Sequence, residues 1–137
     1  LSSEIHQKQE NSFINDEEST VLNLNSLKKM ALEIREYLLT NHLEEFGRLL
    51  HNYWEIKKKL TSGNTNEHIE MLYRVGLKNG AYGGKLLGAG DGGYLLFFYQ
   101  PKKLNQLKKA LEKEGGEVIN FNFEFNGTKI WQVKEKF

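Results

Sequence analysis

The chain contains no cysteine and a single proline among its 137 residues, and its net charge is close to zero. Without cysteine there are no disulfides, thiolate metal sites or thiol nucleophiles, which fits a reducing compartment such as the cytoplasm. Because 19 basic residues balance 18 acidic ones, we expect no nucleic-acid partner. The four histidines lack the HExxH spacing of a zinc site, and we predict no metal site in this chain.

Long hydrophobic runs are also missing. The longest, Tyr94–Tyr99, is far shorter than the roughly 20 residues of a membrane span, and the polar N-terminus lacks the layout of a signal peptide. We therefore expect a soluble, cytoplasmic protein with no membrane partner. The chain begins at Leu1 rather than Met and opens directly into helix-compatible sequence, from which we expect it to be part of a longer polypeptide.

Residues 1–63 carry helical patterns. The polar, acidic stretch Ser2–Glu18 predicts a first helix, and apolar residues at steps of three and four predict a second from about Thr20 to Thr40. A third amphipathic pattern starts at Leu43 and ends near Thr61, Ser62 and Gly63. The last two helices should form a hairpin.

Residues 64–137 combine helices with strand and turn patterns. Thr65 or Asn66 can cap a helix that ends just before Gly80. After a glycine-rich segment, the apolar run Tyr94–Tyr99 predicts a strand buried on both faces.

The C-terminal part of the sequence predicts one more helix and a hairpin. Pro101 at a first helical position and Gly115 after the last turn bound the helix. Apolar and polar residues alternate over 119–125, and Asn126-Gly127 is a strong hairpin signal before a strand that would run to Val133. The whole chain, 1–137, therefore reads as one α+β domain, a small antiparallel sheet covered by helices with an N-terminal helical extension.

Glycine is concentrated in one place, since eight of the thirteen glycines fall between Gly76 and Gly93. Each glycine in a regular element costs roughly 0.5–1 kcal/mol relative to alanine, so such a cluster needs a reason. A Walker A loop is excluded because no Ser or Thr follows Gly84-Lys85, and a dinucleotide site needs a helix where this sequence predicts a strand. A strand-flanked turn rich in backbone N–H groups remains, which can bind an anion or pack against a phosphate-binding loop; a flexible surface turn is the alternative.

The segment GGKLLGAGDGGYLLFF, residues 83–98, resembles the C-terminal glycine motif of the GHMP small-molecule kinases, which include galactokinase, homoserine kinase and mevalonate kinase. The upstream Trp54-x-x-Lys57 and the approach Gly80–Lys85 are similar to the heptose 7-phosphate kinase and fucokinase branch. Asp91 stands where we expect glycine in that motif. The resemblance covers Leu43–Tyr99.

This resemblance implies a ferredoxin-like C-terminal domain of an ATP-dependent sugar kinase. The ATP loop and the catalytic aspartate would lie in an N-terminal kinase domain of the same polypeptide, so we expect no catalytic residue here and no activity of this chain alone. ATP and Mg²⁺ would act in the intact enzyme, and a small-molecule sugar phosphate would be its substrate. The resemblance places Gly88, Ala89, Gly90, Asp91, Gly92 and Gly93 beside the phosphoryl-transfer site, and Lys85, Trp54 and Lys57 near the sugar phosphate.

Other interpretations stay open for most of these residues. Asp91 can be a turn residue rather than a magnesium ligand, and Trp54 and Lys57 can be a packing residue and a solvated charge on a helix. The basic run 57–59 suggests a solvated helix face more than an RNA contact. For the whole chain, the alternative to a kinase domain is a non-catalytic regulatory or ligand-binding module that holds a phosphorylated metabolite.

Overall fold

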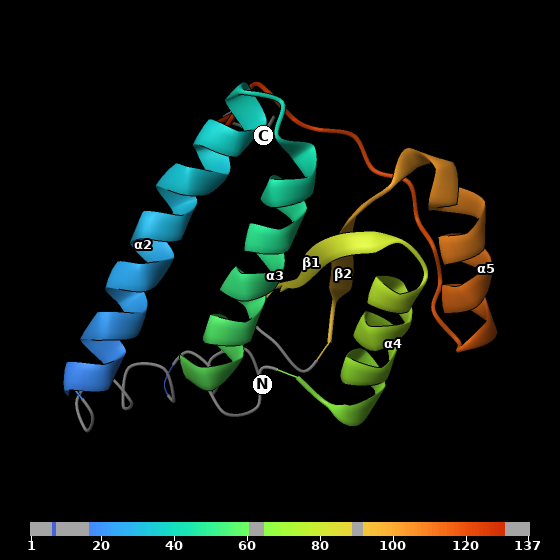
Figure 1. Cartoon of the computed structure of the whole chain (residues 1–137), viewed down its shortest axis with the longest axis horizontal. Coiled ribbons are helices and arrows are strands. Elements are labelled where there is room, and N and C mark those ends of the chain that lie inside the picture. Colours follow the sequence, from blue (N-terminus) through green and yellow to red (C-terminus); the bar gives the residue numbers. More distant parts are fainter. Residues whose placement is uncertain (1–6, 8–16, 61–64, 89–91, 131–137) are drawn as a thin grey trace, which may run out of the picture.

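The computed structural model describes residues 7, 17–60, 65–88 and 92–130. Their elements follow the order helix, helix, helix, strand, strand, helix (Figure 1). No helix in this part of the chain is long and apolar enough to cross a membrane. The expected α+β fold, a small antiparallel sheet covered by helices, is confirmed.

Helices α2 (Glu17–Leu39) and α3 (Leu43–Leu60) form the expected hairpin. The turn between them places Asn41 at φ 59°, a left-handed conformation that asparagine adopts more readily than most residues. The two helices lie side by side in Figure 1. Apart from residue 7 and the first residues of α2, the helix expected over Ser2–Glu18 lies outside the described residues.

Helix α4 (Glu67–Lys78) starts where its sequence predicts. Of the two possible caps, Asn66 does the capping, because its side chain accepts a hydrogen bond from the backbone N–H of Ile69 at 2.9 Å. Gly80 follows the helix with φ 109°, the left-handed conformation that ends the element and turns the chain into the sheet.

Strands β1 (Ala81–Leu87) and β2 (Tyr94–Tyr99) pair antiparallel and make up the sheet of the described residues. The sheet packs with α3 and α4 around a core of four buried side chains, those of Trp54, Ile69, Tyr73 and Leu86. The expectation that β2 is buried on both faces is wrong, since its side chains are half-buried or exposed. The reason is that the sheet has only two strands, and of β2 only Leu95 and Phe97 pack, partly buried, against this core.

The helix expected after Pro101 is confirmed as a 3₁₀ turn, η1 (Pro101–Lys103), followed by α5 (Leu104–Lys113). Gly115 follows at φ 86°. Helix α5 packs against α4, with Leu107 and Leu111 buried.

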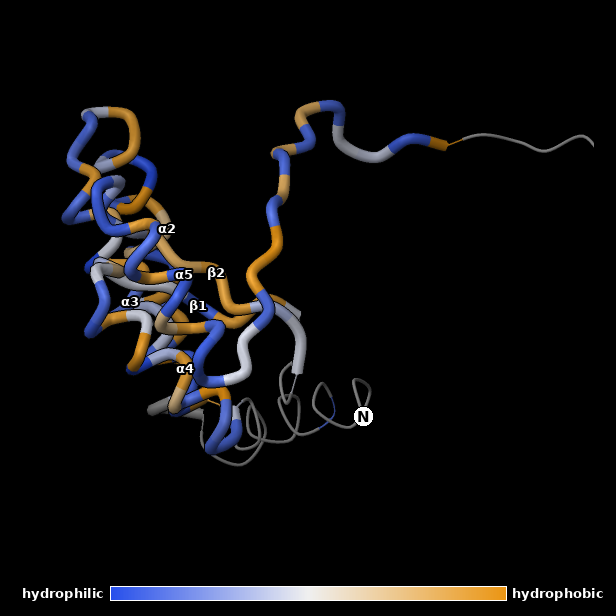
Figure 2. Tube along the Cα trace, turned by 90° about the vertical axis from the view of Figure 1, so that its right-hand side faces the viewer, coloured by the Kyte–Doolittle hydropathy of each residue, from blue (hydrophilic) through white to orange (hydrophobic). Residues whose placement is uncertain are grey.

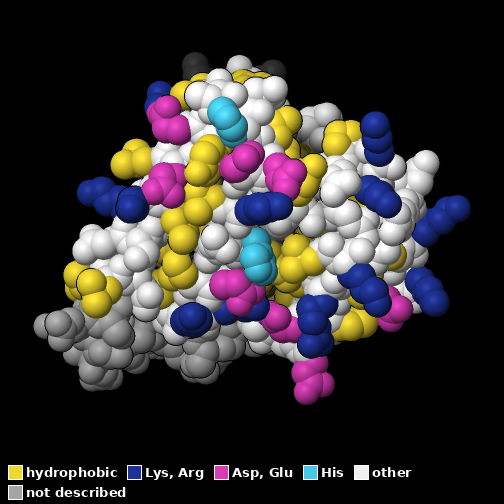
Figure 3. Space-filling model, viewed as in Figure 1, with side chains coloured by type: hydrophobic (Ala, Val, Ile, Leu, Met, Phe, Trp, Pro, Cys, Tyr) yellow, Lys and Arg dark blue, Asp and Glu magenta, His cyan; other side chains and the backbone are white. Residues whose placement is uncertain are grey.

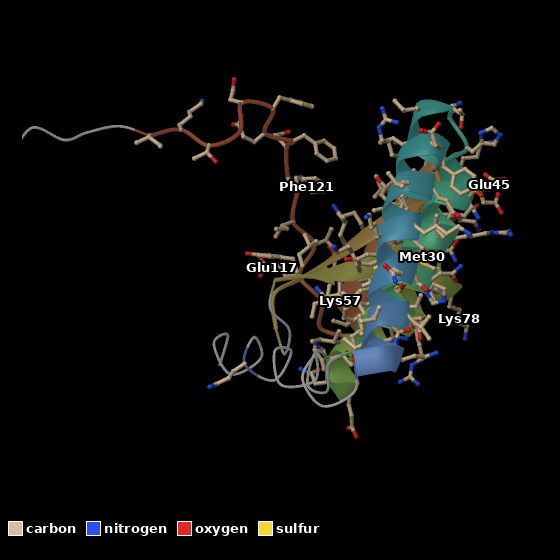
Figure 4. The ribbon with its side chains drawn as sticks, turned by 90° about the vertical axis from the view of Figure 1, so that its left-hand side faces the viewer. Met30, Glu45, Lys57, Lys78, Glu117 and Phe121 are labelled. Atoms are coloured by element: carbon tan, nitrogen blue, oxygen red, sulfur yellow. The ribbon has the colours of Figure 1, made fainter. Side chains whose placement is uncertain are left out.

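The hairpin expected after α5 is wrong for the residues that the structure describes, since 116–130 contains no strand. Phe123 and Phe125 are 75% and 91% exposed, and the segment leads away from the helices (Figures 2 and 4). Glu124 accepts a hydrogen bond from the backbone N–H of Asn126 at 2.7 Å, which lowers the pKa of Glu124. The alternation predicts which side chains of a strand would be buried. An isolated hairpin, however, is only marginally stable in water unless another surface covers its apolar face. Val133 lies outside the described residues.

Candidate functional site

The glycine-rich turn connects the two strands at one end of the sheet, just beyond the pair Leu87 and Tyr94. Gly88 and Gly93 have φ values of 100° and 118°, which L-residues with side chains rarely adopt. A Cβ at Gly93 would also lie 2.6 Å from the carbonyl oxygen of Leu87. The fold of the turn itself therefore requires glycine at these two positions.

Gly92 differs from its neighbours. Its φ lies outside the left-handed region, and a Cβ built on it meets no heavy atom within 4 Å. Neither backbone conformation nor packing among the described residues explains a glycine here, and the position is exposed. Its backbone is thus open to approach from outside this chain. The other members of the predicted loop, Ala89, Gly90 and Asp91, lie outside the described residues.

Two glycines of β1 let the strand lie unusually close to its neighbours. A Cβ at Gly83 would overlap the carbonyl oxygen of Gly47 on α3, and one at Gly84 would overlap the carbonyl oxygen of Leu96 on β2. This close approach carries the next residue, Lys85, alongside α3.

Lys85 and Lys57 come together where β1 passes α3. The ammonium of Lys85 lies 5.1 Å from the centre of the Tyr53 ring, a cation–π contact. Burial, and then the charge of Lys57, lower the pKa of Lys85 below its ordinary value. Figure 4 shows Lys57 on the side of the helices that faces the strands. Two of the three residues predicted to bind substrate are therefore near enough for the charge of Lys57 to act on Lys85.

Trp54, the third predicted substrate residue, lies elsewhere. Its side chain is 1% exposed and packs in the core, with its ring centre 6.4 Å from that of Tyr73. The indole N–H has no hydrogen-bond partner among the described residues. A ring buried to this extent supports the fold as part of the core.

Lys58 is a residue that the sequence reading missed. It bonds to Glu55 at 2.7 Å and to Glu70 on α4 at 3.0 Å, and it lies 5.9 Å from the ring centres of both Trp54 and Tyr73. Burial alone would lower the pKa of Lys58, but the two carboxylates outweigh it and raise the pKa. The spacing of Glu55 and Lys58 was visible in the sequence, whereas Glu70 required the fold.

A second missed group joins α3, α4 and β1. The hydroxyl of Tyr73 donates to the carbonyl oxygen of Gly84 at 3.1 Å, and Nδ1 of His51 lies 2.9 Å from the same hydroxyl. Burial raises the pKa of Tyr73, so the hydroxyl keeps its proton and its donor role. These two contacts link α4 to β1 and to α3, beside Lys85.

The surface argues against an RNA site on the basic run 57–59. Lys58 is committed to two carboxylates, and Figure 3 shows basic and acidic side chains interspersed over the helical face. The described residues hold no group of three or more histidine and acidic side chains that could bind a metal ion.

Two known proteins are similar in sequence to this chain over most of its length. It is 34% identical over 117 residues to D-glycero-alpha-D-manno-heptose 7-phosphate kinase of Campylobacter jejuni, a match that covers 85% of this chain and 34% of that protein. It is 36% identical over 89 residues to L-fucokinase/L-fucose-1-P guanylyltransferase of Bacteroides fragilis, covering 64% of this chain and 9% of that protein. The chain thus spans about a third, or less, of these relatives.

Solved structures share the fold. The crystal structure of L. major mevalonate kinase in complex with R-mevalonate superposes with a TM-score of 0.76 at 16% identity, over 82% of this chain and 34% of that one. Mevalonate kinase from Staphylococcus aureus MRSA252 gives a TM-score of 0.58 at 28% identity, over 70% of this chain and 32% of that one.

The match to a family is direct as well. Residues 34–117 match the family described as GHMP kinases C terminal, a span that runs from α2 through the glycine-rich turn and past α5. With α3, the two-stranded sheet and the glycine motif all inside it, the chain belongs to the GHMP kinase family and carries that family's C-terminal domain.

Proposed function

We propose that this chain is the substrate-side, C-terminal domain of an ATP-dependent sugar kinase whose substrate is a heptose phosphate. The observation that carries the proposal is the 34% identity to a heptose 7-phosphate kinase over 85% of the chain. The match to a fucokinase supports a sugar rather than another small alcohol.

The glycine-rich turn would border the phosphoryl group in transfer. Phosphoryl transfer depends on positioning and on stabilising charge, and backbone N–H groups supply both without rearranging. The open backbone at Gly92 fits such a role, because a neighbouring loop or a phosphate can approach it without meeting a side chain. ATP supplies the transferred group when bound, and its main binding residues and those of Mg²⁺ would come from the N-terminal kinase domain of the same polypeptide. Gly88, Ala89, Gly90, Asp91 and Gly93 belong to the same turn that we propose beside the phosphoryl group.

Lys57 and Lys85 would contact the sugar phosphate, since both bear positive charge and lie near enough for the charge of Lys57 to lower the pKa of Lys85. The enzyme would act in the cytoplasm. Trp54 would act indirectly, by packing beneath α3 and keeping this part of the helix in place.

Comparing this chain with the intact protein tests the proposal. We expect steady ADP release from ATP, Mg²⁺ and heptose 7-phosphate with the intact protein, and none with residues 1–137 alone. ADP release by the isolated chain would contradict the prediction that the main ATP-binding and catalytic residues lie in the N-terminal kinase domain. Binding of a phosphorylated sugar by an intact protein that transfers nothing would favour the regulatory module instead.

Replacing Trp54 with phenylalanine separates packing from ligand contact. We expect the free energy of unfolding to fall by about 1–2 kcal/mol because the smaller ring leaves unfilled core volume, partly offset by removal of an unpartnered N–H. The KM for the sugar phosphate should stay unchanged in the intact kinase. A tenfold rise in KM at an unchanged melting temperature would assign Trp54 to the sugar site after all.

A further inference from the structure

The chain contains two Asn-Gly pairs, Asn79-Gly80 and Asn126-Gly127, and the structure gives them opposite surroundings. Asparagine is chemically labile where glycine follows it, because no side chain on the glycine shields its backbone nitrogen from the asparagine side chain. That nitrogen can attack the side-chain amide only if the backbone and the side chain rotate toward each other. The reactivity of each pair therefore depends on how firmly the surrounding structure holds it.

Asn79-Gly80 is held by α4, by α5 and by the chain that follows β2. The backbone N–H and the side-chain amide of Asn79 both donate to the carbonyl oxygen of Val75, at 3.1 and 2.8 Å. The side-chain oxygen of Asn79 accepts a hydrogen bond from Gln106 on α5 at 3.2 Å. The carbonyl oxygen of Gly80 accepts one from the backbone N–H of Gln100 at 2.9 Å. Rotation at this pair would break several of these bonds at once.

Asn126-Gly127 is open by comparison. Both residues are exposed, in a segment that contains no strand and leads away from the helices (Figures 2 and 4). Within the described part of the chain the backbone N–H of Gly127 donates no hydrogen bond, and a Cβ built on this residue meets no heavy atom within 4 Å. Asn126 bonds to Glu124, only two residues away, at 2.7 Å through its backbone N–H and at 2.6 Å through its side-chain amide. These bonds can move with the segment.

We propose that Asn126 is a site of spontaneous deamidation in the native chain, and that the contacts of the α4 C-terminus protect Asn79 from the same reaction. The backbone nitrogen of Gly127 gives its proton to hydroxide and bonds to Cγ of Asn126, and the side-chain nitrogen takes a proton from water and leaves as ammonia. Water then opens the cyclic imide at either carbonyl carbon, which gives aspartate or isoaspartate at position 126. The net change consumes water and releases ammonia, without an enzyme or a cofactor.

The product differs from asparagine in charge and in hydrogen bonding. A carboxylate, which cannot donate, replaces the side-chain amide that donates to Glu124, so two like charges lie where a hydrogen bond was. The backbone and then the side-chain hydrogen bond from Asn126 lower the pKa of Glu124, and loss of the second should raise this pKa toward its ordinary value. Deamidation therefore adds negative charge beside the exposed Phe125 and removes a contact that holds the turn at 124–126.

Ageing the 137-residue chain in mildly alkaline buffer, made with water enriched in heavy oxygen, tests the proposal. Mass spectrometry of tryptic peptides measures the uptake of labelled oxygen, and trypsin releases the two pairs on separate peptides, residues 79–85 and 114–129. We expect Asn126 to convert about tenfold or more faster than Asn79, because attack at Asn79 first requires local opening of the fold.

Two asparagines on the same peptide as Asn126 are matched controls for exposure. Asn120 and Asn122 are also exposed, but phenylalanine follows each of them and shields the backbone nitrogen. We expect both to stay unlabelled while Asn126 converts. Equal labelling of Asn120, Asn122 and Asn126 would show that exposure alone, and not the open Asn-Gly pair, governs the reaction.

Two variants check the chemistry at position 126. Gly127→Ala should slow the conversion by about tenfold or more, because a Cβ crowds the attacking nitrogen and disfavours the left-handed φ of 65°. Asn126→Gln should prevent it, because the longer side chain would have to close a larger ring. Both side chains are exposed, so neither variant should change the melting temperature of the chain.

Repeating the ageing in guanidinium chloride separates the chemistry from the fold. Once the chain is unfolded, we expect Asn79 and Asn126 to convert at rates within about threefold of each other, because both are then followed by an unshielded glycine. Conversion of Asn79 as fast as Asn126 in the folded chain would overturn the proposed protection by α4 and α5. An Asn126 that reacts in denaturant but not in the folded chain would overturn the proposed site.

Discussion

Replacing Gly92 with valine should lower the turnover of the intact kinase by about 100-fold while leaving the melting temperature of the chain nearly unchanged. The valine side chain would keep the phosphoryl group away from the backbone N–H of residue 92, and the expected loss is of the size seen when one donor is lost from a transition-state site. Stability should survive because a Cβ at Gly92 meets nothing within 4 Å. Steady-state kinetics of the intact enzyme and thermal unfolding of this chain measure the two quantities.

Gly93→Ala provides the contrast within the same turn. Its φ of 118° and the 2.6 Å approach to the carbonyl oxygen of Leu87 should make alanine destabilising in the isolated chain. If Gly92→Val and Gly93→Ala lower stability equally, the turn is a structural element and the proposed contact with the phosphoryl group is lost.

Replacing Gly83 with alanine should have the largest effect on folding. The added methyl group would overlap the backbone carbonyl oxygen of Gly47 on α3 and press on His51, and neither backbone can move without separating β1 from α3. We expect the free energy of unfolding to fall by about 3 kcal/mol or more, and the melting temperature by about 10 °C. Gly92→Ala is the control, since the same methyl group meets open space there. A Gly83→Ala chain as stable as the control would show that the contact between α3 and β1 is loose.

The helices were predictable because their signals are local. Apolar spacing predicted that α2 and α3 are helices, and the choice between Thr65 and Asn66 concerned only which side chain caps α4. The glycine motif was also readable, since it combines an unusual density of glycine with flanking strand sequence.

The site was only partly predictable, because it depends on which helix faces meet. Trp54 and Lys57 stand three residues apart in one sequence motif, yet α3 turns the first into the core and the second toward the strand side. Sequence spacing does not predict the contact between Lys85 and Tyr53, because it joins β1 to α3 and the whole of α4 lies between them in the sequence. Lys58 was hidden for the same reason, since Glu70 meets it across two helices.

The error over residues 119–125 has a different cause. Alternation states which side of a strand should be buried, but not where the covering surface comes from. The described residues contain no such surface for Phe121, Phe123 and Phe125, whose rings contact one another instead.

The exposed rings of Phe121, Phe123 and Phe125 should affect the solution behaviour of the purified chain. A described segment that contains no strand and exposes a row of phenylalanine side chains can act as a template onto which a second molecule adds. We therefore expect concentrated chain to self-associate through residues 119–125, whose phenylalanine side chains are exposed.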